Sequence, residues 1–297
     1  MDPLLSRVRE GDRRAYLALL LAPDAARPAL AALAAYALEL ARVPLAVSEP
    51  MAGEIRLQWW VEVVRGERDG EAARHPVARP LLEAIAGYGL TRGGLAATAE
   101  ARTRDLHAAP MDGVADLEDY AGRVASVPIQ IACQVLDADA ASAAASAAGH
   151  AGVYAVLIDR LASLARDRAG GRLFLPADVA MGAWVTSQDL QDPGFADARP
   201  DAAAALVREM LGLAASYRER FEADAAVLPA RLAPAFAAAR GRVATERAIA
   251  SMGGAVLVAP PEVSPLAEQR AVVTTRGLFR RGPTLLGRLR ERLGRPG

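Results

Sequence analysis

The sequence DRLASLARDRAGGRLFLP at residues 159–176 decides how this chain folds. It completes a helical pattern that starts near residue 141, and Gly170 and Gly171 end that pattern. Apolar residues recur every three or four positions in it, at Val153, Val156, Leu157, Leu161 and Leu164. The stretch therefore predicts a long helix that ends at a turn before Pro176.

The same helix carries a polar face. Asp159, Ser163 and Asp167 are four residues apart, so their side chains project in nearly the same direction. If this face lines a central cavity, it can bind a metal ion or a polar ligand. The alternative is pairing within the helix to Arg160, Arg166 and Arg168, since such pairs are common on exposed helices.

The rest of the chain repeats the helical pattern. Runs rich in Ala, Leu, Arg and Glu are bounded by prolines and glycines, and alternating β-branched runs are absent. We predict an all-α, single-domain protein with helices near residues 13–21, 26–43, 51–65, 77–87, 92–107, 116–135, 141–168, 203–227 and 231–252.

The composition excludes several classes of protein. Of the 297 residues, 53% are hydrophobic, which suffices for a large core. The formal net charge is zero, which argues against a nucleic-acid partner. Cys133 is the only cysteine, so no disulfide or cysteine-based zinc site forms within the chain. The polar start and the short apolar run at 28–38 predict a cytoplasmic protein, at most attached to the surface of the inner membrane.

The composition changes after residue 262. From Arg270 onward there are eight arginines and one glutamate, and leucines recur at helical spacing between residues 285 and 293. We therefore divide the chain into a helical domain, 1–262, and a basic tail, 263–297. A basic amphipathic helix of this kind can lie on an anionic membrane surface.

Residues 171–176, GRLFLP, together with the following ADVAMGAWVTSQDL, resemble the stretch that closes the second metal-binding helix of squalene/phytoene synthases. Asp105-Leu106, the segment 116–125 and Tyr217 resemble further family positions in the same order. This resemblance implies the terpenoid-synthase (isoprenoid synthase) type of helical bundle with a central apolar cavity. In the family, two aspartate-rich helices hold magnesium against a prenyl diphosphate.

Most of those carboxylates are missing here. The family's second helix reads roughly QxxNxxRDxxED, and in this alignment Ser163 and Arg166 replace carboxylates while only Asp167 keeps its own. At the first motif, residues 43–47 read VPLAV. Magnesium needs several oxygen ligands, usually carboxylates and phosphates. We therefore expect a pseudoenzyme with no catalytic residue, no metal and no cofactor.

Two other interpretations remain open. In one, the chain is a Mg²⁺-dependent prenyl transferase that joins allylic diphosphates, with the metal held by Asp159, Asp167 and either Glu39 or Asp105. Electrostatic stabilisation of the departing diphosphate would then drive the reaction. In the other, the chain is a peripheral lipid-binding protein anchored by its basic tail.

A subgroup of the family matches better. Residues 38–60, LELARVPLAVSEPMAGEIRLQWW, resemble proteins similar to the mitochondrial complex I assembly factor with a squalene/phytoene synthase domain, which also lack the first aspartates. The resemblance implies a role in assembly of respiratory NADH dehydrogenase, with complex I subunits or assembly factors as partners. It leaves room for a prenyl diphosphate or a lipid chain in the cavity.

The candidate site residues follow from these likenesses. For a ligand we expect Tyr36, Arg123, Asp159, Ser163, Asp167 and Arg172. For an interaction surface we expect Glu49, Glu54, Arg56, Gln58 and Trp60. On one helix the two neighbouring tryptophans cannot face the same way, so we expect one of Trp59 and Trp60 inside and the other partly exposed.

Overall fold

The computed structural model describes residues 2–107 and 110–279. Within these ranges the chain is helical, and the only β-pairing is an isolated bridge between Met111 and Pro176. The α-helices are α1 (Pro3–Gly11), α2 (Arg13–Leu20), α3 (Arg27–Arg42), α4 (Pro50–Arg65), α5 (Asp69–Ala72), α6 (Ala78–Tyr88), α7 (Arg92–Ala101), α8 (Val114–Ala121), α9 (Val127–Leu136), α10 (Ala138–Ala141), α11 (Ala145–Ala169), α12 (Ala177–Gly182), α13 (Ser187–Gln191), α14 (Phe195–Ala198), α15 (Pro200–Ala225), α16 (Ala233–Gly241), α17 (Val243–Met252) and α18 (Pro265–Val273). Short 3-10 turns are η1 (Val43–Leu45), η2 (Arg102–Leu106), η4 (Ser142–Ala144), η5 (Ala230–Leu232), η6 (Gly253–Leu257) and η7 (Thr275–Leu278), and η3 (Gly122–Ser126) is one turn of π-helix.

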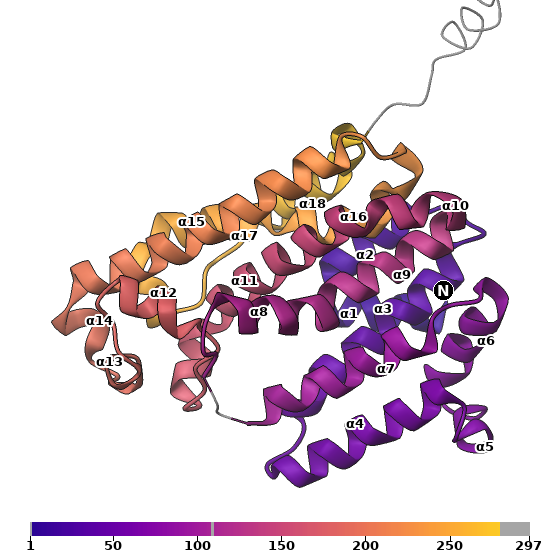
Figure 1. The fold of residues 1–297 in the computed structure, drawn as a ribbon, viewed down its shortest axis with the longest axis horizontal. Helices are drawn as coiled ribbons and strands as arrows, with labels where there is room; N and C mark the ends of the chain where they lie inside the picture. The colour runs from indigo at the N-terminus through magenta and orange to yellow at the C-terminus, as the bar shows by residue number, and fades with distance from the viewer. Residues whose placement is uncertain (1, 108–109, 280–297) are drawn as a thin grey trace, which may run out of the picture.

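The longest helices organise the bundle. Helix α11 runs through the middle and packs along α15, which forms one edge of the molecule, while α4 and α7 lie side by side on the opposite edge (Figure 1). One group of buried apolar side chains joins α1, α3, α4, α6 and α7, and a second surrounds α11 and α15. The predicted all-α fold is confirmed.

Prolines and glycines set the helix ends. Pro28 and Pro50 lie in the first turns of α3 and α4, where a missing backbone N–H costs nothing. Gly66 ends α4 with φ +87°, a conformation that glycine adopts without strain. Pro44 stops α3, so Glu49 lies beyond that helix, as the N-cap of α4.

Two predicted helices, 92–107 and 141–168, are α-helical over only part of their length, since the 3-10 turns η2 and η4 occupy residues 102–106 and 142–144. Two others are interrupted. The segment 116–135 is divided by the π-helical turn η3, and 231–252 is divided at Arg242. The hydrophobic period continues through both breaks, so it did not reveal them. Helices α3 and α11 meet the length and hydropathy of a membrane span, but half or more of each apolar window is buried inside the bundle, as in any core helix.

The predicted tail begins within the packed bundle. Helix α18 contacts α16 and α2, and the ring of Phe279 packs 5.4 Å from that of Phe236. Residues 263–279 therefore belong to the packed structure. The predicted amphipathic helix, at residues 285–293, lies outside the described residues.

Candidate functional site

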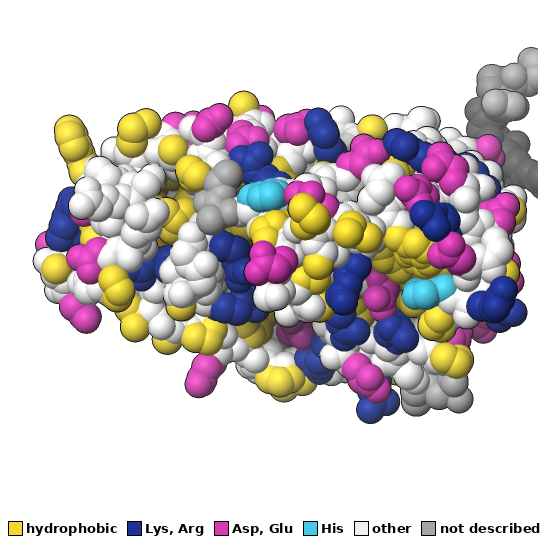
Figure 2. Space-filling model, turned by 90° about the horizontal axis from the view of Figure 1, so that it is seen from below, with side chains coloured by type: hydrophobic (Ala, Val, Ile, Leu, Met, Phe, Trp, Pro, Cys, Tyr) yellow, Lys and Arg dark blue, Asp and Glu magenta, His cyan; other side chains and the backbone are white. Residues whose placement is uncertain are grey.

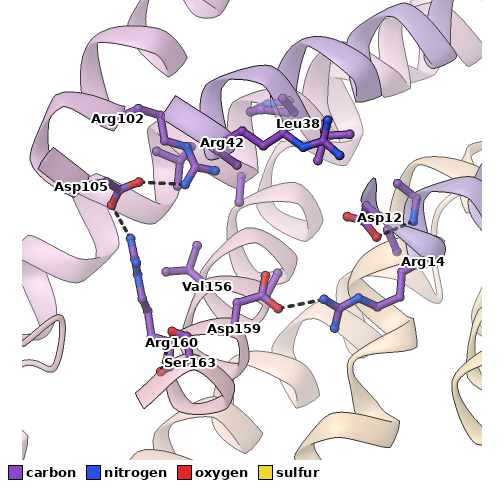
Figure 3. A pocket seen from close by; sticks show the side chains of 18 of the residues that line it. Asp12, Arg14, Leu38, Arg42, Arg102, Asp105, Val156, Asp159, Arg160 and Ser163 are labelled. Carbon is purple, nitrogen blue, oxygen red and sulfur yellow. Dashed lines mark hydrogen bonds and ion pairs between the residues drawn. The ribbon is translucent and has the colours of Figure 1, made fainter. Parts of the chain in front are cut away.

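A cavity of about 610 Å³, open to solvent on one side, lies between α2, α3, α9, α11 and α16 (Figure 3). This volume is within the range of about 300–1,000 Å³ that is typical of small-molecule sites. The cavity exists because the facing helices contribute small side chains, which leave space between their axes. The alanines that line the cavity are Ala15, Ala34, Ala37, Ala41, Ala125, Ala155, Ala238 and Ala239.

The lining changes in character along α11. Ala155 and Val156 contribute to an apolar part together with Leu38 of α3 and Ile129 of α9. From Asp159 to Asp167 the same helix turns charged side chains toward the cavity. The cavity is therefore amphipathic.

Asp105, in the turn η2, is bound by two arginines. Arg160 of α11 donates to its Oδ1 at 2.5 Å, and Arg102 donates to its Oδ2 at 3.0 Å. Tyr120 also donates its hydroxyl to Asp105, at 2.8 Å from Oδ1. Burial alone would raise the pKa of Asp105, but the two guanidinium groups outweigh it and hold this pKa below its usual value. The guanidinium of Arg160 also lies 4.1 Å from the centre of the Phe174 ring, a cation–π contact.

Asp159 is bound by arginines of two other helices. Arg242 donates from Nε at 2.9 Å and from Nη2 at 2.5 Å, a bidentate pair, and Arg14 of α2 adds a contact at 3.3 Å. Desolvation would raise the pKa of Asp159, but Arg242 and Arg14 keep it below the usual value. The neighbouring residues Asp159 and Arg160 point to different walls of the cavity, toward Arg14 and Asp105 respectively (Figure 3).

Asp167 is buried near the end of α11. Ser163 donates its hydroxyl to Oδ2 at 2.5 Å, and Arg172 contacts Oδ1 at 3.4 Å. Arg166 lies farther away, at 3.9 Å. The backbone N–H of Arg172 donates to the carbonyl of Asp167 at 2.8 Å, which folds the turn around Gly171 and brings the Arg172 side chain back to the helix.

A second feature is the outer face of α4. Met51 and Ile55 are one turn apart and are 72% and 66% exposed, and Leu45 of η1 is exposed next to this helix in the chain. Glu54 pairs with His107 at 3.0 Å, while Gln58 donates to Glu62. The helix therefore presents apolar side chains with polar ones beside them.

The sequence model of squalene/phytoene synthases matches residues 8–277. The chain belongs to the squalene/phytoene synthase family.

The chain is also similar to several curated proteins. It is 29% identical over 185 residues to the Bos taurus and Homo sapiens proteins named NADH dehydrogenase (ubiquinone) complex I, assembly factor 6. That alignment covers 62% of this chain and 55% of each relative, so the chain spans about half the length of these relatives. The Rattus norvegicus protein of the same name is 28% identical over 225 residues, covering 74% of this chain and 67% of that protein.

Two solved structures share the fold. One is the squalene synthase HpnC from Alicyclobacillus acidocaldarius, with a TM-score of 0.66 at 18% identity, covering 84% of this chain and 92% of that one. The other is a dehydrosqualene synthase in complex with ligand, with a TM-score of 0.70 at 13% identity, covering 92% and 94%. Both are evidence for the bundle only.

The cavity of this family member does not fit the magnesium ions of the synthases. Within residues 2–107 and 110–279, no three His, Cys, Asp or Glu side chains are grouped closely enough to hold a metal ion. The aspartates at 105, 159 and 167 are each bound by at least one arginine instead. A cation would have to displace guanidinium groups from these carboxylates before it could bind.

The predicted ligand residues divide into two groups. Asp159, Ser163, Asp167 and Arg172 all line the cavity, and the first three do so from the shared face of α11. Tyr36 lies in the core, where its hydroxyl donates to the carbonyl of Leu95. Arg123 pairs with Asp119 on the exterior. Neither is among the residues that line the cavity.

The two carboxylates added in the enzymatic interpretation also lie apart. Asp105 lines the cavity, whereas Glu39 pairs with Arg7 and is not among the lining residues. The proposed pairing within α11 is wrong for Asp159, whose bidentate partner Arg242 is 83 residues away in the chain. Sequence periodicity places residues on a helix face but does not reveal which helix will face them.

The predicted interaction residues lie on or beside α4. Glu49, Glu54, Arg56 and Gln58 are at least partly exposed, whereas Trp60 is 4% exposed and packs 5.2 Å from the ring of Tyr36. Trp59 is the partly exposed member of the pair, and its indole N–H donates to Glu71.

Sequence reasoning missed four cavity arginines. Arg14, Arg42, Arg102 and Arg242 come from different segments and share no motif. The only available signal was that all basic residues of the chain are arginine, which forms bidentate pairs with carboxylates more readily than lysine does.

Proposed function

We propose that this chain acts without catalysis in assembly of the respiratory NADH dehydrogenase (complex I), by binding partner proteins and a prenyl or lipid chain. The names of the bovine, human and rat relatives support the assembly role. The amphipathic cavity supports the bound chain, because it offers an apolar wall next to charged groups.

The pairing of the cavity carboxylates with arginines supports the proposal that the chain is not a catalyst. Asp105, Asp159 and Asp167 hold Arg160, Arg242 and Arg172. In a magnesium-dependent prenyl transferase these carboxylates would have to ligate cations. Here they neutralise guanidinium groups, which supports a pseudoenzyme over the prenyl-transferase alternative.

The partner surface we propose is the outer face of α4. Met51 and Ile55 give it an apolar centre, and Glu49, Glu54, Arg56 and Gln58 give it a polar margin. Interfaces commonly combine an apolar core with a polar rim. We propose complex I subunits or other assembly factors as the proteins that cover it.

The test is complementation of a strain that lacks its own copy of this gene. The double variant Met51→Gln and Ile55→Gln keeps helix-forming residues but removes the apolar centre. Loss of an interface hot spot costs about 2 kcal/mol or more, roughly a thirtyfold loss of affinity. We therefore expect assembled NADH dehydrogenase on native gels to fall toward the level of the deletion strain.

Leu266→Gln is the matched control, since Leu266 is 75% exposed on α18, a different helix. It should complement fully. Full complementation by the α4 double variant would reject this surface, and failure of the unmodified chain to complement would reject the assembly role. We also propose that the chain is a cytoplasmic protein that attaches peripherally to the inner membrane. Fractionation of the same cells tests this location, and salt should then release the chain from membranes.

A further inference from the structure

We infer that the cavity binds the phosphate or diphosphate head group of a single-chain amphiphile directly through arginine side chains, without a metal ion. This inference rests on the proposed function in one respect, the bound prenyl or lipid chain. It adds the chemistry of the head group and the residues that recognise it.

The cavity has a net positive charge. Seven arginines and four aspartates line the cavity, with no glutamate or histidine among the lining residues, so the cavity has a surplus of three positive charges. The whole chain has a formal net charge of zero. The surplus is therefore a local property of the cavity, where low-dielectric walls strengthen its field.

Most of the lining arginines are already paired with aspartates of the cavity. Asp105 holds Arg102 and Arg160, and Asp159 holds Arg242 and Arg14. The fourth aspartate, Asp12, accepts from the backbone N–H of Ala15 and caps α2.

Two lining arginines stand outside these pairs. Arg42, at the end of α3, makes no ion pair with any residue in the described ranges. Arg166 of α11 reaches Asp167 only at 3.9 Å, and its side chain is 64% exposed. Together with Arg172, whose contact to Asp167 is long at 3.4 Å, they are the guanidinium groups that an anion can recruit at least cost.

The lining arginines lie on more than one side of the cavity. Arg42 and Arg102 enter from one side of the cavity, opposite Asp159 and Ser163 on α11 (Figure 3). Arg166 lines the same cavity from α11. Guanidinium groups bind phosphoryl oxygens bidentately and remain charged at all accessible pH values. An anion between these walls would meet donors from two helices.

The wall that α11 forms also restricts the shape of the ligand. The lining of α11 changes from Ala155 and Val156 to Asp167 over twelve residues, about 18 Å at the helical rise per residue. A ligand that follows this wall needs a hydrocarbon chain at one end and an anion at the other. A diphosphate carries about three negative charges at neutral pH and matches the surplus, since phosphates ionise a second time near pH 6.

This arrangement opposes a divalent cation. Mg²⁺ entering the cavity would meet the positive surplus, and Mg²⁺ in solution would neutralise the diphosphate that the arginines attract. Magnesium should therefore weaken binding.

The experiment is calorimetric titration of the full chain with geranylgeranyl thiodiphosphate, first in EDTA and then in excess Mg²⁺. We expect binding in EDTA and a several-fold higher Kd in Mg²⁺. The double variant Arg42→Gln and Arg166→Gln should raise the Kd at least tenfold. Arg208→Gln, which changes an exposed arginine of α15 away from the cavity, is the matched control and should leave the Kd unchanged.

Further ligands separate the sources of the head group. Lysophosphatidic acid tests a phospholipid head group, inorganic diphosphate the head group alone, and geranylgeraniol the chain alone. Tighter binding of either phosphorylated amphiphile than of geranylgeraniol supports the inference and identifies the source. A requirement for Mg²⁺, equal binding of geranylgeraniol, or wild-type affinity in the double variant overturns it. Complementation by a chain that binds none of these ligands would reject this inference while leaving the assembly role intact.

Discussion

At the residue scale, the central feature is a set of cavity carboxylates that hold arginines from distant parts of the chain. Asp105 receives Arg160 from 55 residues away, and Asp159 receives Arg242 from 83 residues away. Each pair ties α11 to another segment. The charged groups therefore hold the walls of the cavity in place and also set its electrostatic potential.

The Asp105→Asn substitution tests this structural role. It leaves Arg102 and Arg160 without their anion in a buried setting, which typically costs about 3–5 kcal/mol. Because the folded-state pKa of Asp105 is lowered, the wild-type carboxylate stabilises the fold above the unfolded pKa of about 3.9 and loses this contribution as the pH falls through the folded value. Urea denaturation should show a large difference between variant and wild type near neutral pH that narrows in acid.

The control is Asp119→Asn, which removes an exposed partner of Arg123. Exposed pairs contribute about 0–1 kcal/mol, so this variant should unfold almost like the wild type. Two results would contradict the stabilising role of Asp105. One is an equal loss of unfolding free energy in the two variants, and the other is a loss in Asp105→Asn that does not change with pH.

The sequence predicts only part of the site, for a physical reason. Helical spacing placed Asp159, Ser163 and Asp167 on one face, and the structure brings all three to the cavity. Helical spacing could not predict Arg242 or Arg14 as partners of Asp159, because tertiary packing decides which segments meet. The family likeness did not help with Tyr36 or Arg123, since neither lies among the lining residues.

At the element scale, α11 and the π-helical turn η3 approach each other closely at Gly152. Gly152 of α11 lies against Ser126, and a Cβ atom on Gly152 would lie 2.5 Å from the backbone nitrogen of Ser126 and 2.8 Å from its Cα. Backbone atoms cannot move aside as a flexible side chain can. The turn that carries Val124 and Ala125 to the cavity thus depends on this glycine.

The Gly152→Ala variant should therefore be destabilised despite the better helix propensity of alanine. Overpacking of this kind costs about 1–3 kcal/mol. Gly149→Ala, one turn earlier on α11 with open space around its added methyl, should gain about 0.5–1 kcal/mol. Thermal unfolding of both variants and the wild type measures these changes in stability. A melting temperature of Gly152→Ala equal to or above that of the wild type would show that α11 and η3 are less closely packed at Gly152 than the structure indicates.

The helices themselves were well predicted where proline or glycine marks their ends, as at Pro44, Pro50 and Gly66. The π-helical turn was not predicted, because one extra residue in a turn leaves the local hydrophobic pattern nearly unchanged. The short helices α12, α13 and α14 were also missed, since four to six residues are too few for a period to be visible.

At the scale of the whole molecule, the cavity differs in charge from the face that Figure 2 shows. The face seen from below shows basic, acidic and hydrophobic side chains interleaved, without a broad region of one sign (Figure 2). The cavity, in contrast, has its surplus of arginines. The family fold of this chain therefore contains a cavity whose lining has more arginines than carboxylates.

The measurement that tests this account most directly is release of diphosphate from farnesyl diphosphate by the purified chain in the presence of Mg²⁺. Since the carboxylates at positions 105, 159 and 167 are bound by arginines, we predict no release above that of a protein-free control. Magnesium-dependent release that is lost in Asp159→Asn and Asp167→Asn would contradict the account and establish the chain as a prenyl transferase.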